Sequence, residues 1–470
     1  MGEIPIIKLP AINWRRLFFG TLLLSIQSTF GQPNIPKFES FQSINQRTGA
    51  SPSINANPSQ PINSLLSNDP YKDQNYRAMQ QGGMTVPGPT NNRRRSVEDE
   101  RTTSNEERGQ AAIGINELRL KLFQNNFLQY LHLNPDSFSL TRAVYLSESG
   151  FYENQTRPTY EQFESSIKSA ARIVKQILNR EGLDENDGMA VNYSIQKLYT
   201  QQNEYFDSTT GKSFLINRLH YDWDDYLGDK DWTKMFVSKL LQTGSGQCHS
   251  LPLFYLCLAE QFHAKAYLSL APNHSFIQYF DKTGKRYNFE ATNGNLVTQT
   301  WLMQSTYVNA TALKNKTYLD TLSSRRLYAQ CLSDLLLCYL MKTKHYDNFS
   351  EQITKRIFEI DSLNMTALME QANRVYTIYI KECNAAGNPP PDRYSSYPKL
   401  SAAYQTLQDC ERKVEQTGFQ EMPKEAYQQW LQSLELEKRK EENRREQEKM
   451  KQEINRLKKI NSRIIPRKKG

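Results

Sequence analysis

Cys248 and His274 are the residues whose types and surroundings best suit nucleophilic chemistry. Cys248 follows Gly244-Ser-Gly246 and opens residues 250–262, where leucine and phenylalanine recur at helical spacing. Unpaired amides at a helix start stabilise a thiolate, and an imidazolium brought close by the fold stabilises it further. Such a thiolate would attack an acyl or amide carbon. Considered alone, Cys248 has a second interpretation as a small buried apolar residue.

The residues after His274 predict a β-hairpin that supplies an acceptor for its imidazole. Asp281-Lys-Thr-Gly284 fits a type I turn in a three-residue loop, with glycine at the left-handed position. This loop pairs Phe276 with Glu290, so that Glu290 becomes the diagonal neighbour of His274 on one face. We prefer Glu290 as the acceptor and keep Asn288, one step further away on that face, as the alternative. A shift of one residue would move both to the opposite face.

The surrounding pattern predicts a mixed α+β domain. Apolar residues recur at helical spacing in two segments before the cysteine, residues 115–131 and 160–180. Aromatic and β-branched residues between turns then predict three strands, at 266–270, 274–280 and 285–291. Beyond residue 318 we expect only helices, over 327–341, 350–360, 366–383 and 402–415.

Residues 214–295 resemble the transglutaminase-like superfamily, closest to its bacterial branch. The resemblance rests on Asp229-Lys-Asp-Trp232, Leu240-Leu-Gln-Thr-Gly-Ser-Gly-Gln-Cys248-His-Ser-Leu-Pro252, Ala271-Pro-Asn-His274 and Asn288-Phe-Glu-Ala-Thr292-Asn-Gly294. It implies a papain-like cysteine-protease fold, in which the cysteine-bearing helix packs on an antiparallel sheet that carries the histidine and the acid. It also implies a Cys248, His274, Glu290 triad. The family usually has aspartate where this chain has Glu290.

The resemblance implies thiol-dependent acyl transfer, or hydrolysis of an amide or peptide bond, on a protein or peptide substrate. It offers Gln242 as a side-chain donor to the oxyanion, with Trp232 and Gln247 as rivals. Backbone amides near Cys248 would also contribute. We assign His249 no catalytic role. The alternative function is a catalytically inactive module of the same fold that binds a protein partner through its helical C-terminal region.

Residues 344–368 resemble one tetratricopeptide unit, with Tyr346, Ile357 and the Asp361-Ser-Leu-Asn364 turn near their expected places. An ordinary helical bundle remains the alternative. The chain is thus divided into five parts. They are a signal peptide (1–31), a disordered linker (32–113), the transglutaminase-like domain (114–316), the tetratricopeptide-like helical region (317–420) and a charged helical tail (421–470).

The N-terminus predicts export to the periplasm or the medium. Lys8, Arg15 and Arg16 precede an apolar run at 17–26, too short to span a membrane, and small or polar residues follow up to Gly31. The linker is rich in asparagine, glutamine, serine and proline, a composition typical of disorder.

The net charge of +9 sits mostly in the tail. Residues 433–470 contain 14 Lys and Arg against 7 Asp and Glu, which is +7 and leaves +2 for the rest of the chain. An anionic surface is therefore a possible partner of the tail, and we do not expect a nucleic acid partner for an exported chain. The six cysteines lack CxxC spacing, and no cysteine or histidine pairs recur at ligand spacing, so we expect neither a metal nor a cofactor.

Overall fold

The computed structural model describes residues 120–152, 157–208, 210–225, 231–344 and 346–419, with a few helical positions between 436 and 454. The predicted signal peptide, the predicted linker and most of the tail lie outside the described residues. Among the helices in these ranges, none combines the length and the apolar character needed to cross a membrane.

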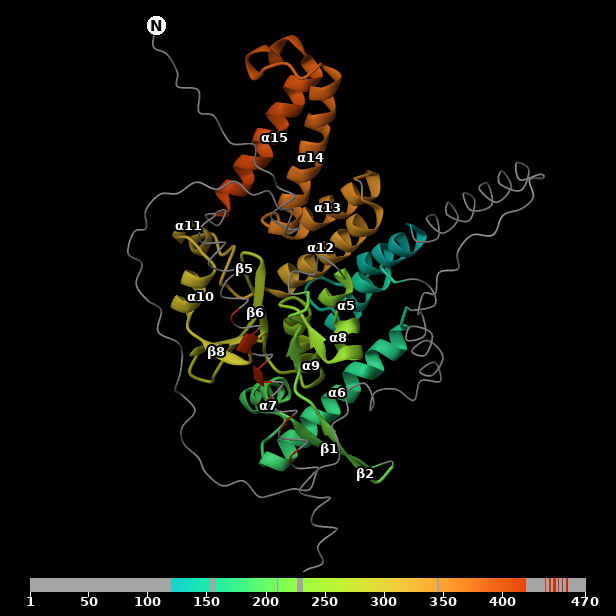
Figure 1. The fold of residues 1–470 in the computed structure, drawn as a ribbon, viewed down its shortest axis with the longest axis vertical. Coiled ribbons are helices and arrows are strands. Elements are labelled where there is room, and N and C mark those ends of the chain that lie inside the picture. Colours follow the sequence, from blue (N-terminus) through green and yellow to red (C-terminus); the bar gives the residue numbers. More distant parts are fainter. Residues whose placement is uncertain are drawn as a thin grey trace, which may run out of the picture.

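The described chain is a mixed α+β structure with small sheets and a helical C-terminal region (Figure 1). After a helical segment at 120–131, the helices are α5 (Leu140–Ser149), α6 (Tyr160–Glu181), α7 (Gly188–Thr200), α8 (Val237–Thr243), α9 (Ser250–Gln261), α10 (Gln299–Ser305), α11 (Ala310–Lys314), α12 (Ser324–Thr343), α13 (Asn348–Ile360), α14 (Met365–Ala385) and α15 (Pro398–Gln416). The strands are β1 (Asn203–Asp207), β2 (Lys212–Ile216), β3 (His220–Tyr221), β4 (Ser245–Gly246), β5 (Tyr267–Ala271), β6 (His274–Phe280), β7 (Arg286–Glu290) and β8 (Asn295–Val297). Short 3₁₀ helices span Trp232–Met235 (η1) and Pro391–Ser396 (η2).

Helix α9 is the centre of the main core. Ten of its twelve residues are buried, from Ser250 to Ala259. A helix that is apolar all round needs cover on every side. Here α5, α6, α7 and α8 contact it, and β5 and β6 pack beside it (Figure 1). The predicted helix at 250–262 is therefore confirmed, and its burial is more complete than a single apolar stripe.

Strands β5 to β8 form a four-stranded antiparallel sheet in sequence order. The predicted hairpin register is confirmed, because Gln278 pairs with Asn288 and the N–H of Asp281 donates to the carbonyl of Lys285 at 3.1 Å. Gly284 has a φ of 83°, the left-handed conformation that this loop requires and that glycine adopts without strain. The turn residues thus fixed the register as the sequence predicts.

Two glutamates, the buried Glu148 and the partly buried Glu260, link the helices around α9. The carboxylate of Glu260, near the end of α9, accepts from the backbone N–H groups of Leu140 and Thr141 at the start of α5. Glu148, near the end of α5, accepts in the same way from Val237 and Ser238 at the start of α8. Each carboxylate also accepts from the hydroxyl of the second residue, at 2.6 Å. Since α8 leads directly into the Cys248 loop, this chain of helix caps fixes where the loop begins.

Helices α12 and α13 belong to the same core as α9. Leu332 and Leu335 of α12 and Ile353 of α13 are fully buried in that cluster. The expected division at residue 316 therefore runs through a shared core. Helices α14 and α15 pack mainly on each other through two smaller clusters, and in Figure 1 they extend away from the sheet. All four helices expected after residue 318 are confirmed. The likeness of α13 and α14 to a tetratricopeptide unit stays a prediction.

Two small sheets were not predicted. Strands β1 and β2 form an antiparallel hairpin, and β3 pairs in parallel with β4, aligning Tyr221 with Gly246. The second pairing brings the acidic and aromatic segment 221–225 beside the loop that leads to Cys248. Gly246 also lets the loop lie close to the start of α9, because an added Cβ would lie 2.6 Å from the hydroxyl oxygen of Ser250.

Candidate active site

Cys248 lies in the turn between β4 and α9, one residue before the N-cap His249. Its thiol is half-buried, and its Sγ lies 3.8 Å from the carbonyl oxygen of Asn273. The hydroxyl of Ser275 donates to the Cys248 carbonyl at 2.6 Å. The start of the cysteine helix is therefore held directly against the β5–β6 turn, whose end carries His274.

His274 and Glu290 form a direct pair across the hairpin. His274 Nε2 lies 2.6 Å from Glu290 Oε2, and the carboxylate is almost fully buried. The other carboxylate oxygen, Oε1, accepts from the backbone N–H and the hydroxyl of Thr292, at 3.2 and 2.7 Å. Because Nε2 contacts Glu290, Nδ1 is the ring nitrogen available to the Cys248 thiol. The diagonal contact that the sequence predicts is therefore present.

Each member of this pair stabilises the charged form of the other. Burial lowers the pKa of His274, but the carboxylate of Glu290 and the thiol of Cys248 outweigh it, so the pKa lies well above its usual 6.5. Burial raises the pKa of Glu290, but His274 and the Thr292 bonds lower it more, below its usual 4.5. Both shifts favour the charged form of the pair, an imidazolium beside a carboxylate.

Asn288, the alternative acceptor, has other partners. Its side-chain oxygen accepts from Gln278 at 3.0 Å, and its amide donates to the carbonyl of Val297 at 3.1 Å. It therefore ties β6, β7 and β8 together on the same face, further from the imidazole. Its contacts are those of a buried sheet residue.

Among the described residues, no hydrogen bond joins the Cys248 thiol to any of the three side chains expected as oxyanion donors. Gln242 lies exposed on α8. Gln247 is fully buried, and its amide donates to the carbonyls of Asp222 and Asp225, at 3.1 and 2.6 Å. Trp232 starts η1, and its partly buried ring packs against the main hydrophobic core. Gln247 thus holds the 221–225 segment in place, a role that only the tertiary structure shows.

Backbone amides are better placed to bind an oxyanion. Among the described hydrogen bonds, the N–H groups of Cys248 and His249 have no acceptor, whereas Gln247 N–H donates to Ser250 Oγ and Leu251 N–H to the Gln247 carbonyl. These two amides lie at the N-terminal end of α9, next to the thiol.

Sequence reasoning missed the surroundings of His249. Its Nε2 lies 3.3 Å from Asp334 Oδ2, and Asp334 comes from α12, more than 80 residues further along the chain. No local signal in the sequence could have paired these two residues.

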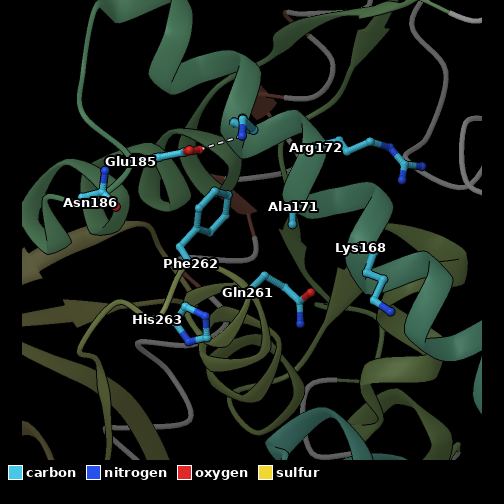
Figure 2. Close-up of a pocket in the computed structure, with 9 residues that line it drawn as sticks. Lys168, Ala171, Arg172, Glu185, Asn186, Gln261, Phe262 and His263 are labelled. Atoms are coloured by element: carbon cyan, nitrogen blue, oxygen red, sulfur yellow. Dashed lines mark ion pairs between the residues drawn. The ribbon is translucent and has the colours of Figure 1, made fainter.

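The pocket drawn in Figure 2 lies at the other end of α9, about a helix length from Cys248. It is an open pocket of about 350 Å³ between α6 and the residues after α9. Its lining includes Lys168, Arg172, Phe262 and His263, and Lys175 pairs with Glu185 across it at 2.9 Å. No triad residue lines it, so it is separate from the candidate site.

The cysteines are unpaired, and four of the six are buried (Cys257, Cys331, Cys338 and Cys410). Within the ranges that the structure describes, no group of three or more His, Cys, Asp or Glu side chains could hold a metal ion.

No protein-family model matches this chain, and neither a curated protein nor a solved structure is similar enough to count as a match.

Proposed function

We propose that the protein carries out thiol-dependent acyl transfer or amide hydrolysis through Cys248, His274 and Glu290, within a papain-like arrangement of a cysteine-bearing helix against an antiparallel sheet. The observation that carries the proposal is the 2.6 Å contact between His274 and the buried Glu290, next to a half-buried thiol at a helix start. Each feature alone has a structural explanation. Together they are what a thiolate–imidazolium pair requires.

The proposed reaction begins with the Cys248 thiolate and the protonated His274. The thiolate attacks the carbonyl carbon of an amide, a C–S bond forms, and the oxyanion accepts from the N–H groups of Cys248 and His249. The C–N bond then breaks as His274 gives its proton to the departing amine. Glu290 keeps the imidazole oriented and stabilises its charged form. Water or a primary amine attacks the thioester, His274 takes the proton of the attacking group, and the thiolate leaves.

The acyl acceptor decides the type of enzyme. Water makes it a peptidase or an amidase, and a primary amine makes it a transglutaminase. We propose a protein or peptide substrate outside the cytoplasm, on the basis of the predicted signal peptide and the family resemblance of residues 214–295.

The test is the rate of Cys248 alkylation by iodoacetamide between pH 4 and 9, mapped by mass spectrometry in the mature protein and in His274→Ala. We expect Cys248 to react well below the free-thiol pKa of about 8.5, and His274→Ala to abolish this low-pH reaction. Cys383, also half-buried, is the internal reference.

If Cys248 titrates like an ordinary thiol in both proteins, the acyl-transfer proposal is wrong. The inactive binding module, acting through the helical C-terminal region, then becomes the proposal to test.

A further inference from the structure

The residue that follows the nucleophile has its own buried carboxylate partner. His249 Nε2 lies 3.3 Å from Asp334 Oδ2, and the two side chains are 28% and 11% exposed. Gln330, one turn earlier on α12, donates to Asp334 Oδ1 at 3.4 Å, so a buried side chain of α12 restrains the carboxylate. The pair lies at the N-cap of α9, directly beside the thiol in the chain.

Three ionisable groups act on His249, each from a different element. Asp334 approaches from α12, Glu148 from α5, and Cys248 precedes it in the turn before α9. Burial lowers the pKa of His249, but these groups together raise it from 6.5 to about 9. Asp334 makes the largest favourable contribution and is the only one of the three with a direct contact to the ring.

We propose that Asp334 is a positioning residue for the thiol chemistry: it holds His249 as a second imidazolium beside Cys248, so that α12 takes part in setting the reactivity of the thiol. The inference rests on the proposed function. His274 remains the acid and base. His249 has a different part, because its ring is held by Asp334 and its charge adds to the favourable field at the helix start.

The physical reason is the orientation of the pair. Its positive member is next to the thiol in the chain, and its negative member is anchored on another helix. A nearby positive charge favours a thiolate over a thiol. Removing either member should therefore raise the pH at which Cys248 becomes reactive, without touching the His274–Glu290 contact.

The experiment repeats the alkylation profile on the mature chain with Asp334→Asn and His249→Gln. Asp136→Asn is the matched control, because it removes a carboxylate that pairs with Arg325 of α12 at an exposed position. We expect the thiol midpoint to rise by roughly half to one pH unit in the two test variants, a three- to ten-fold loss of rate below the midpoint. The control should follow the unchanged protein. Thermal unfolding of each variant is measured in parallel.

The outcomes separate the two proposals. If the unchanged protein reacts at low pH and His274→Ala abolishes this, but neither test variant moves the midpoint, the inference is wrong and the proposed function stands. A fall in thermal stability alone would show a structural pair and would equally overturn it. A midpoint shift in Asp334→Asn without one in His249→Gln would mean that Asp334 does not act through His249. If Asp334→Asn does not fold, the partly exposed His249→Gln decides. Absence of low-pH reactivity in the unchanged protein overturns both proposals.

Discussion

Both carboxylate oxygens of Glu290 have bonding partners. Oε2 contacts the imidazole of His274, and Oε1 accepts two hydrogen bonds from Thr292. The carboxylate is therefore held in one orientation, and its charge is balanced by His274. The glutamate side chain is long enough to bring Oε2 within 2.6 Å of the ring nitrogen.

At the residue scale, we predict that Glu290→Gln removes most of the low-pH reactivity of Cys248. The amide keeps the shape but loses the charge that raises the pKa of His274, so less imidazolium is available to stabilise the thiolate. We expect roughly a ten-fold fall in alkylation rate near pH 6, one pKa unit. Asn288→Ser is the control: it should lower the melting temperature by loosening β6 to β8, with the pH profile unchanged. The reverse result would make Asn288 the acceptor.

At the element scale, the buried carboxylate of Glu148 replaces a local capping residue at the start of α8. The N-cap of α8 is Phe236, which offers no side-chain acceptor. Glu148 therefore satisfies two orphan N–H groups that would otherwise be buried without partners. Burial opposes its ionisation most strongly, and although the bonds from Val237 and Ser238 favour it, the pKa of Glu148 rises from 4.5 to about 7.

The raised pKa predicts a pH dependence of stability with a definite sign. The folded state binds the proton of Glu148 more tightly than the unfolded state, so this group lowers the free energy of unfolding as the pH rises from about 4.5 to about 7. The full effect is roughly 3 kcal/mol. Glu148→Gln should remove this decline, at a pH-independent cost of about 1–2 kcal/mol for the poorer cap.

The measurement is the melting temperature from pH 5 to 8 for the unchanged protein, Glu148→Gln and the surface control Glu185→Gln. Glu185 pairs with Lys175 at a position where both side chains are about half exposed, so its removal should change little. An equal pH slope in all three proteins would contradict the prediction.

At the scale of the whole molecule, the α14–α15 hairpin is a distinct unit anchored near its two ends. Its own clusters are small, and its last turn docks on α11 and the residues just after it. There Asn315 donates to the Gln416 carbonyl and Thr317 to the Thr417 carbonyl, at 2.7 and 2.8 Å. Gly418 makes this docking possible. It has a φ of +85°, and an added Cβ would lie 2.2 Å from the backbone nitrogen of Ala312.

We predict that Gly418→Ala loosens the hairpin from the main core. The clash with backbone and the left-handed φ together should cost about 2 kcal/mol or more. Gly387→Ala is the matched control, because Gly387 has a φ of +78° but open space around it, so it should cost only about 1 kcal/mol. Hydrogen exchange should show faster exchange across α14 and α15 in Gly418→Ala than in the control, with Cys248 alkylation unchanged in both. Equal exchange in the two variants would show that the docking does not hold the hairpin.

The sequence by itself determined the features that depend on near neighbours. The Asp281–Gly284 turn and the alternation of the flanking strands fixed the hairpin register, and with it the contact between His274 and Glu290. Glycines before an apolar run predicted a cysteine at a helix start. Helices α13 and α15 were predictable because their apolar residues repeat along a single face, whereas α12 is buried on every side from Tyr328 to Tyr339.

Only the tertiary structure decided which side chains meet across long stretches of chain. Glu260 caps α5 from 120 residues away, Glu148 caps α8 from about 90, and Asp334 reaches His249 from another helix. A buried polar group bonds to whichever partner the tertiary packing brings within hydrogen-bonding distance. The spacing of apolar residues along the sequence does not reveal that partner. For the same reason Gln247, a candidate oxyanion donor by its position in the sequence, donates instead to the segment that β3 brings beside it.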